Sequence, residues 1–227
     1  MSRSEASIEQ REELVHVPVG AASLEGSLVV PRDATGVVVF AHGSGSSRHS
    51  ARNQFVARRL QAAGLATVLI DLLTAEEERI EAATRHLRFD IGLLAGRLSA
   101  AMAWLAERAE TRRLRVGLFG ASTGGGAALV AAAREPEGVG AVVSRGGRPD
   151  LAGESLPRVS APTLLIVGSH DVTVLALNER AMVQMTCEVR LEIVPGASHL
   201  FEEPGTLERV ADLAAGWFGR YLRVPYT

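Results

Sequence analysis

Short apolar runs alternate along the chain with longer segments in which apolar residues recur at helical spacing. Apolar runs that predict strands lie near residues 14–19, 23–30, 36–43, 66–72, 115–120, 140–144, 163–169 and 189–196. Segments that predict helices lie near residues 50–63, 84–109, 124–134, 173–184 and 205–222. This alternation is typical of a mostly parallel sheet with helices on both faces. We therefore predict an α/β fold with an eight-stranded sheet.

The first two strands differ from the others in their pattern. They alternate between apolar and polar residues and are joined by a short turn, so we expect an antiparallel pair at the edge of the sheet. The other strands are continuous apolar runs, as expected of strands buried on both faces. The segment 84–109 is the clearest helix, because one apolar stripe runs along it. That stripe consists of Leu87, Ile91, Leu94, Leu98, Met102 and Leu105.

Length and composition indicate one domain. A chain of 227 residues with 47% hydrophobic residues can bury a single large core. No repeat, linker or insertion large enough for a cap domain is visible, so we expect one domain over 1–227 with its core at about 14–222.

Charge and targeting signals restrict the partners and the compartment. The formal charge is −2, with 24 basic and 26 acidic residues spread along the chain, which does not favour nucleic acid or membrane surfaces as partners. The single cysteine, Cys187, cannot form an internal disulfide, and the N-terminal residues lack the apolar core of a signal peptide. No apolar run approaches the roughly 18 residues that span a bilayer. We expect a cytoplasmic protein with a small-molecule substrate; its oligomeric state stays open.

All 24 basic residues are arginine, so the chain has no lysine. Schiff-base chemistry, a P-loop lysine and a Tyr/Lys catalytic pair are therefore excluded.

The stretch Gly120-Ala121-Ser122-Thr123-Gly124 fits the motif G-x-S-x-G between a predicted strand and a predicted helix. In that context a sharp turn lifts the serine hydroxyl out of the sheet, and glycines avoid collisions in the turn. Ser122 is thus the candidate nucleophile. The alternative is that Ser122 simply caps the following helix.

A serine nucleophile needs a histidine to take its proton and a carboxylate to hold that histidine. Asp171 follows the seventh predicted strand and His199 follows the eighth, which gives the chain order Ser, Asp, His. His170 is the second choice of histidine, and Asp150 is the reserve acid. We predict that Ser122, Asp171 and His199 form a catalytic triad.

Two backbone N–H groups are needed to bind the oxyanion of an acyl-transfer reaction, and Ser44 and Thr123 are the candidates. His42 is expected to brace the loop after the third strand rather than to react. The six histidines lack metal-ligand spacing, so we predict no metal, no cofactor and activity in the presence of EDTA.

The chain resembles the α/β-hydrolases, and more narrowly the small, cap-free branch similar to dienelactone hydrolase. The resemblance covers residues 14–222 and rests on AHGSGSSRHS, GASTGGG, the loop at Asp171 and GASHLF. It implies an α/β-hydrolase fold without a cap domain, the triad named above, and hydrolysis of esters or lactones. Dienelactone hydrolases carry cysteine where this chain has Ser122, so plain carboxylic esters are the better expectation. The segment 145–160 is too short for a helical lid, which favours short acyl chains.

Two other classes remain as alternatives. Gly120, Gly124 and Gly126 also fit the glycine spacing of short-chain dehydrogenases that bind NAD(P), but that fingerprint follows the first strand and its chemistry needs a lysine. A non-catalytic binding protein with the hydrolase fold is the other alternative.

Arg145 and Arg148 follow the sixth predicted strand, at the same sheet edge as Ser122. Either guanidinium could hold a carboxylate of the substrate. The alternative is that each pairs with a local acid such as Asp150 or Glu154.

Overall fold

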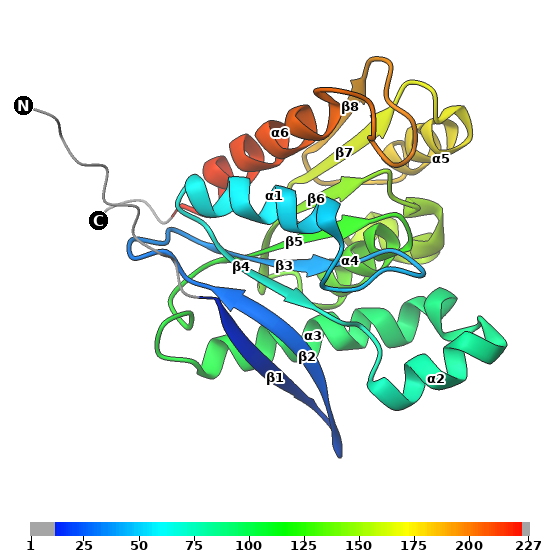
Figure 1. Cartoon of the computed structure of the whole chain (residues 1–227). Coiled ribbons are helices and arrows are strands. Elements are labelled where there is room, and N and C mark those ends of the chain that lie inside the picture. Colours follow the sequence, from blue (N-terminus) through cyan, green and yellow to red (C-terminus); the bar gives the residue numbers. More distant parts are fainter. Residues whose placement is uncertain (1–11, 224–227) are drawn as a thin grey trace, which may run out of the picture.

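The computed structural model describes residues 12–223, in which eight strands form one sheet (Figure 1). The strands are β1 (Glu13–Val19), β2 (Ala22–Val29), β3 (Val37–Ala41), β4 (Ala66–Ile70), β5 (Val116–Ala121), β6 (Val139–Arg145), β7 (Thr163–Gly168) and β8 (Val189–Val194). Their order across the sheet is β1-β2-β4-β3-β5-β6-β7-β8. β1 and β2 pair antiparallel, as do β2 and β4, and all other pairs are parallel. The predicted eight-stranded, mostly parallel sheet with a hairpin entry is confirmed.

Helices cover both faces of the sheet, which explains the continuous apolar runs of its central strands (Figure 1). α3 (Ile91–Glu107) and α4 (Thr123–Arg134) pack on one face, and α1 (Ala51–Ala62) and α6 (Thr206–Tyr221) pack on the other. Every residue of β3, β4, β6 and β7 is buried, whereas β1 alternates between buried and exposed positions. The carboxyl ends of the parallel strands therefore meet at one edge between two helical layers.

The predicted helix at 84–109 starts too early. A helix end and a helix start lie within the region, so its first residues do not belong to α3. α2 (Ala75–Thr84) ends at Arg85, whose φ of 55° is left-handed. After the short 3₁₀ helix η1 (Leu87–Phe89), the carboxylate of Asp90 accepts a hydrogen bond from the N–H of Leu93 and starts α3.

α2 itself was not predicted, because it buries only one residue and has no apolar stripe. A capping box between Thr74 and Glu77 stabilises its first turn. The 3₁₀ segment η2 (Pro149–Arg158) was not predicted either, and it packs against α4 and α5 (Val172–Met182).

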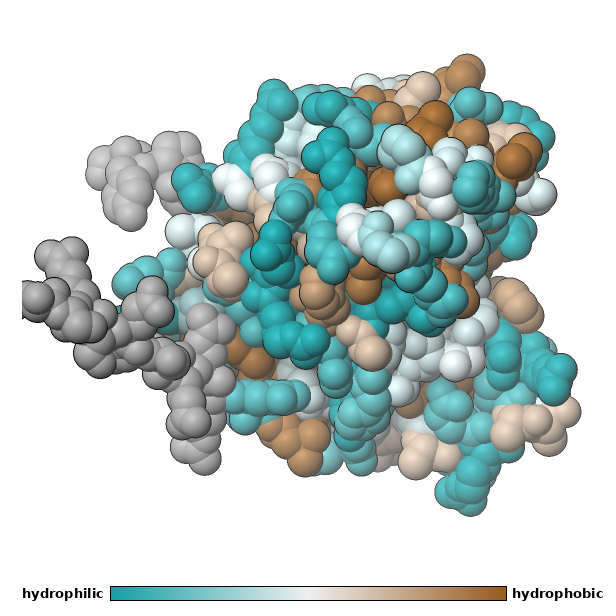
Figure 2. Space-filling view, turned by 45° about the horizontal axis from the view of Figure 1, so that its top comes forward, coloured by the Kyte–Doolittle hydropathy of each residue, from teal (hydrophilic) through white to brown (hydrophobic). Residues whose placement is uncertain are grey.

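The surface carries hydrophobic side chains in small, separate groups. On the face shown in Figure 2, hydrophobic areas are scattered among hydrophilic ones. The large exposed hydrophobic residues come from different elements: Leu14, Ile80, Phe89, Val172, Val183, Ile193 and Leu200. Within residues 12–223, no helix is long and apolar enough to cross a membrane.

Candidate active site

Ser122 lies in a strained turn between β5 and α4. Its φ and ψ are 51° and −121°, a conformation that non-glycine residues rarely adopt and that costs on the order of 1–3 kcal/mol. Two backbone hydrogen bonds fix it: the Ser122 N–H donates to the carbonyl oxygen of Arg145 at 3.2 Å, and the Arg148 N–H donates to the Ser122 carbonyl oxygen at 3.0 Å. Backbone groups at the end of β6 and just after it therefore bond both the N–H and the carbonyl oxygen of Ser122.

Close backbone contacts explain the glycines around Ser122. A Cβ at Gly120 would lie 2.4 Å from the carbonyl oxygen of Gly124, and a Cβ at Gly124 would lie 2.2 Å from that of Ala41. Ser122 stands at the N-cap position of α4, but its side chain makes no capping hydrogen bond to that helix. Its Cβ instead lies close to Gly43, in the loop after β3.

His199 and Asp171 are brought together from two loops. The Nδ1 atom of His199, after β8, lies 2.6 Å from Oδ2 of Asp171, after β7. The ring also lies over Gly146, where an added Cβ would be 3.4 Å from Nδ1 and from Cε1. The Ser122 hydroxyl makes no hydrogen bond to His199 or to any other described residue; such bonds are often long before substrate binds.

The competing histidine and the reserve acid have other surroundings. His170 is exposed, and its ring makes no hydrogen bond with the residues that the structure describes. Asp150 accepts two hydrogen bonds from the guanidinium of Arg148, at 2.8 and 2.7 Å. These bonds hold the pKa of Asp150 below its ordinary value and raise the pKa of Arg148.

The loop after β3 is joined to the serine turn. The hydroxyls of Ser44 and Thr123 lie 2.8 Å apart, so the two candidate oxyanion donors come from neighbouring segments. His42 is buried behind them: its Nε2 accepts from the N–H of Leu72 at 3.0 Å, and Nδ1 lies 3.0 Å from the carbonyl oxygen of Gly43. Because both ring nitrogens are engaged, His42 braces the loop.

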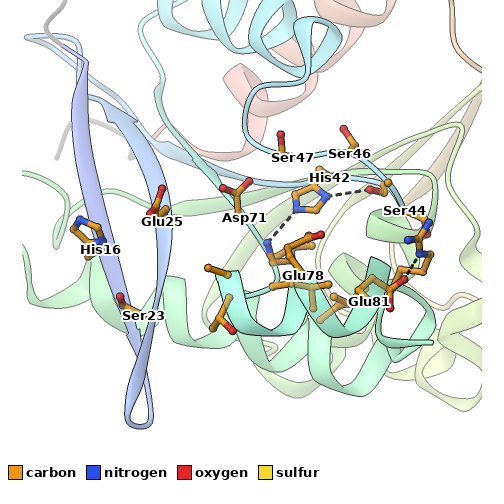
Figure 3. Close-up of a pocket in the computed structure, with 18 residues that line it drawn as sticks. His16, Ser23, Glu25, His42, Ser44, Ser46, Ser47, Asp71, Glu78 and Glu81 are labelled. Carbon is orange, nitrogen blue, oxygen red and sulfur yellow. Dashed lines mark hydrogen bonds and ion pairs between the residues drawn. The ribbon is translucent and has the colours of Figure 1, made fainter. Parts of the chain in front are cut away.

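A cavity of about 620 Å³ opens beside this loop. Figure 3 shows the β1–β2 hairpin with His16, Ser23 and Glu25 on one side, and the loop carrying Ser44 and its neighbours on the other. Five hydroxyl residues line it: Ser23, Ser44, Ser46, Ser47 and Thr74. Its sequence signal was weak because α2, which forms one wall, has no apolar stripe.

Most carboxylates of this cavity already have a partner. Arg48 pairs with both Glu25 and Asp71, and Arg88 pairs with Glu81. Two arginines thus pair with three of the four carboxylates that line the cavity, so the lining keeps an excess of negative charge.

Arg145 has the opposite character. It is only 8% exposed, and its Nε and Nη1 atoms are buried without a hydrogen-bond partner among residues 12–223. Burial lowers the pKa of Arg145 to about 10, with a smaller contribution from the charge of Arg52. Of the two arginines predicted to hold a substrate, Arg148 is paired with Asp150 and Arg145 is unpaired.

The sheet order and the strand-end loops define an α/β-hydrolase. Residues 24–217 match the model of the dienelactone hydrolase family, and the chain belongs to that family. It is similar to the crystal structure of a dienelactone hydrolase from Anabaena variabilis, with 64% identity and a TM-score of 0.92 over 94% of this chain and 99% of that one. Est1E from Butyrivibrio proteoclasticus shares the fold, with 15% identity and a TM-score of 0.76 over 91% of this chain and 98% of that one.

Two proteins of Mycobacterium tuberculosis, provisionally named phosphoribosyl transferase, are 59% identical to this chain over 215 residues. The match covers 95% of this chain and 48% of each relative. The chain thus spans about half the length of these relatives.

Proposed function

We propose that this chain is a serine hydrolase that cleaves short-chain carboxylic esters or lactones through an acyl-enzyme on Ser122. The observation that carries the proposal is the 2.6 Å contact between His199 and Asp171, at the sheet edge where the strained Ser122 lies. A base held by a carboxylate near a half-buried serine turn is the arrangement that activates a serine.

In the proposed reaction, the Ser122 hydroxyl attacks the acyl carbon while Nε2 of His199 takes its proton. The carboxylate of Asp171 accepts a hydrogen bond from the Nδ1–H group of His199 and stabilises the imidazolium that forms. The N–H groups of Ser44 and Thr123 hydrogen-bond the oxyanion. His199 then gives the proton to the leaving oxygen as the bond from the acyl carbon to that oxygen breaks, which releases the alcohol or opens the lactone ring. Water next attacks the acyl carbon while His199 takes one of its protons. The bond from the acyl carbon to Oγ of Ser122 breaks, His199 returns the proton to Oγ, and the carboxylic acid leaves.

The preference for short acyl chains rests on the surroundings of the site. The segment after β6 forms η2, which packs against α4 and α5. The cavity beside Ser44 is lined by hydroxyl groups, carboxylates and apolar side chains, and this mixture suits a small group with a polar part better than a long aliphatic chain. We propose that a neutral polar part of the ester lies in this cavity.

The name of the mycobacterial relatives concerns proteins about twice as long as this chain. We infer that the part shared with this chain is a hydrolase unit and that any phosphoribosyl transfer belongs to the remainder. Incubating this chain with phosphoribosyl pyrophosphate and nucleobases should release no pyrophosphate.

Active-site labelling tests the proposal. A serine-directed alkyl phosphonate should add one adduct, on the peptide that contains Ser122, and Ser122→Ala should lose that adduct and several orders of magnitude in kcat. His199→Ala should show a similar loss. An adduct on another residue, or an alanine variant with normal rates on p-nitrophenyl valerate, would contradict the role of Ser122. A wild-type chain that forms no adduct and hydrolyses no ester would favour the binding-protein alternative.

A further inference from the structure

A turn of two glycines contacts both the proposed nucleophile turn and its base. Gly146 has a φ of 51°, and a Cβ added to it would lie 3.4 Å from two ring atoms of His199. A Cβ at Gly147 would lie 1.8 Å from the hydroxyl of Ser144, so only glycine fits there. Glycine has little conformational preference of its own. The position of this turn is therefore set by its contacts with the rest of the chain.

Asn178 of α5 makes one of these contacts. Its Nδ2 atom donates to the carbonyl oxygen of Gly147 at 3.0 Å and to that of Val174, one helical turn earlier, at 2.8 Å. Both partners are acceptors, so the two hydrogens of one amide nitrogen suit them and a carboxylate would not. The side chain is fully buried, which keeps water from competing for the bond to Gly147. α5 thereby anchors the glycine turn.

One peptide group connects Asn178 to Ser122. The carbonyl oxygen of Gly147 accepts the bond from Asn178. The N–H of the same peptide group belongs to Arg148 and donates to the carbonyl oxygen of Ser122 at 3.0 Å. The peptide group is planar, so fixing its carbonyl oxygen also fixes the direction of the N–H that supports the strained Ser122. The side chain of Asn178 thus acts on the nucleophile turn through a single peptide group.

Packing alone does not explain an asparagine at this position. The Oδ1 atom of Asn178 is buried and has no hydrogen-bond partner among residues 12–223. A buried polar atom without a partner is costly, and an apolar side chain of similar size would avoid that cost. What the asparagine provides, and a leucine would not, is the donor to Gly147.

We propose that Asn178 is a positioning residue for catalysis: it fixes the turn at residues 146–147 and so sets the position of the Ser122 hydroxyl relative to the ring of His199. This assignment rests on the proposed hydrolase function. Asn178 is fully buried and acts through the backbone, without touching the substrate or the reacting atoms. Its loss misplaces the two catalytic groups, so it should lower kcat and leave KM largely unchanged.

The first test removes the donor at nearly constant shape. In Asn178→Leu, kcat for p-nitrophenyl valerate should fall by about 10- to 100-fold while KM stays within about twofold. Labelling of Ser122 by the alkyl phosphonate should slow by about the same factor. Asn53→Leu is the matched control: Asn53 is 2% exposed in α1, its Oδ1 also lacks a partner among the described residues, and its loss should leave kcat as in the wild type. An unchanged kcat in Asn178→Leu, or an equal fall in Asn53→Leu, overturns the assignment.

A second pair of variants tests the donor even if Asn178→Leu does not fold. Asn178→Gln keeps an amide donor, and Asn178→Met has nearly the same size without one. The kcat of Asn178→Gln should be at least about threefold above that of Asn178→Met, the effect of one neutral hydrogen bond. Equal kcat values in the two, or losses that follow the melting temperature instead of the donor, overturn the positioning role. If valerate hydrolysis survives in Ser122→Ala, the hydrolase function itself fails; if it needs Ser122 but not Asn178, only the positioning role fails.

Discussion

The two sides of Ser122 differ in how their charges are balanced. Toward β4, a cavity of about 620 Å³ is lined by four carboxylates, three of which pair with two arginines of the protein, so negative charge is in excess. Toward β6, Arg145 is buried with no counterion among the described residues. The two sides therefore carry unbalanced charges of opposite sign.

This difference indicates what each side can recognise. A pocket with an excess of carboxylates repels an anionic group and suits neutral polar groups. An unpaired buried guanidinium destabilises the protein, because no counterion compensates its charge. The two sides therefore differ in the sign of the charge that each would tolerate.

The largest expected effect tests whether both sides serve one catalytic centre. Asp171→Asn should lower kcat by about 10³- to 10⁴-fold, because the wrong tautomer of His199 is then favoured. The loss should be equal for p-nitrophenyl valerate and mono-p-nitrophenyl glutarate in steady-state assays. Asp150→Asn is the control and should lose far less, since Asp150 pairs with Arg148 rather than with His199. Unequal losses on the two esters would mean that the two sides do not share the triad.

The second prediction concerns the cost of the unpaired charge. Arg145→Met should raise the free energy of unfolding by about 1–3 kcal/mol in urea denaturation, because an apolar side chain replaces an uncompensated buried cation. The pKa of Arg145 is lowered on folding to about 10, so the unfolded chain holds this proton more tightly. The penalty is thus fully present at every pH well below 10, and the gain should be equal at pH 6 and pH 8.

Arg148→Met is the contrasting variant. It breaks the existing ion pair with Asp150, so it should lower the free energy of unfolding slightly. A loss of stability in Arg145→Met would show that Arg145 has a structural partner, and the contrast between the two sides of Ser122 would disappear.

The third prediction addresses the cavity. Ala75→Trp, on an exposed position of its wall, should fill part of the space and lower kcat/KM for 1-naphthyl acetate by about tenfold. Methyl acetate, which does not need the space, should change by less than about twofold. A uniform loss on both esters would remove the cavity from the substrate site.

The smallest effect concerns the ion pair between Arg52 and Glu202. Glu202→Gln should lower the free energy of unfolding by less than about 1 kcal/mol, because both side chains are partly exposed and such pairs contribute little. Urea denaturation measures this change. A loss of more than about 2 kcal/mol would show that Glu202 balances the positive charge on the β6 side.

Local patterns were enough to predict most of the fold. The eight strands are found from apolar runs, and the antiparallel β1–β2 pair from alternation. α2 was missed because its stability comes from a capping box and from ion pairs, which leave no apolar stripe in the sequence. Its cavity was missed for the same reason.

The sequence alone determined the order of strands and helices, the glycine-rich turn that carries Ser122, and the placement of Asp171 and His199 after neighbouring strands. These features depend on side-chain periodicity and on residues adjacent in the chain, so they can be recognised without coordinates. Only the tertiary structure decided which of the two arginines, Arg145 or Arg148, has a counterion within the described residues. Three residues apart and alike in sequence, they separate because alternation buries Arg145 toward α1, whereas the turn after β6 brings Arg148 to Asp150.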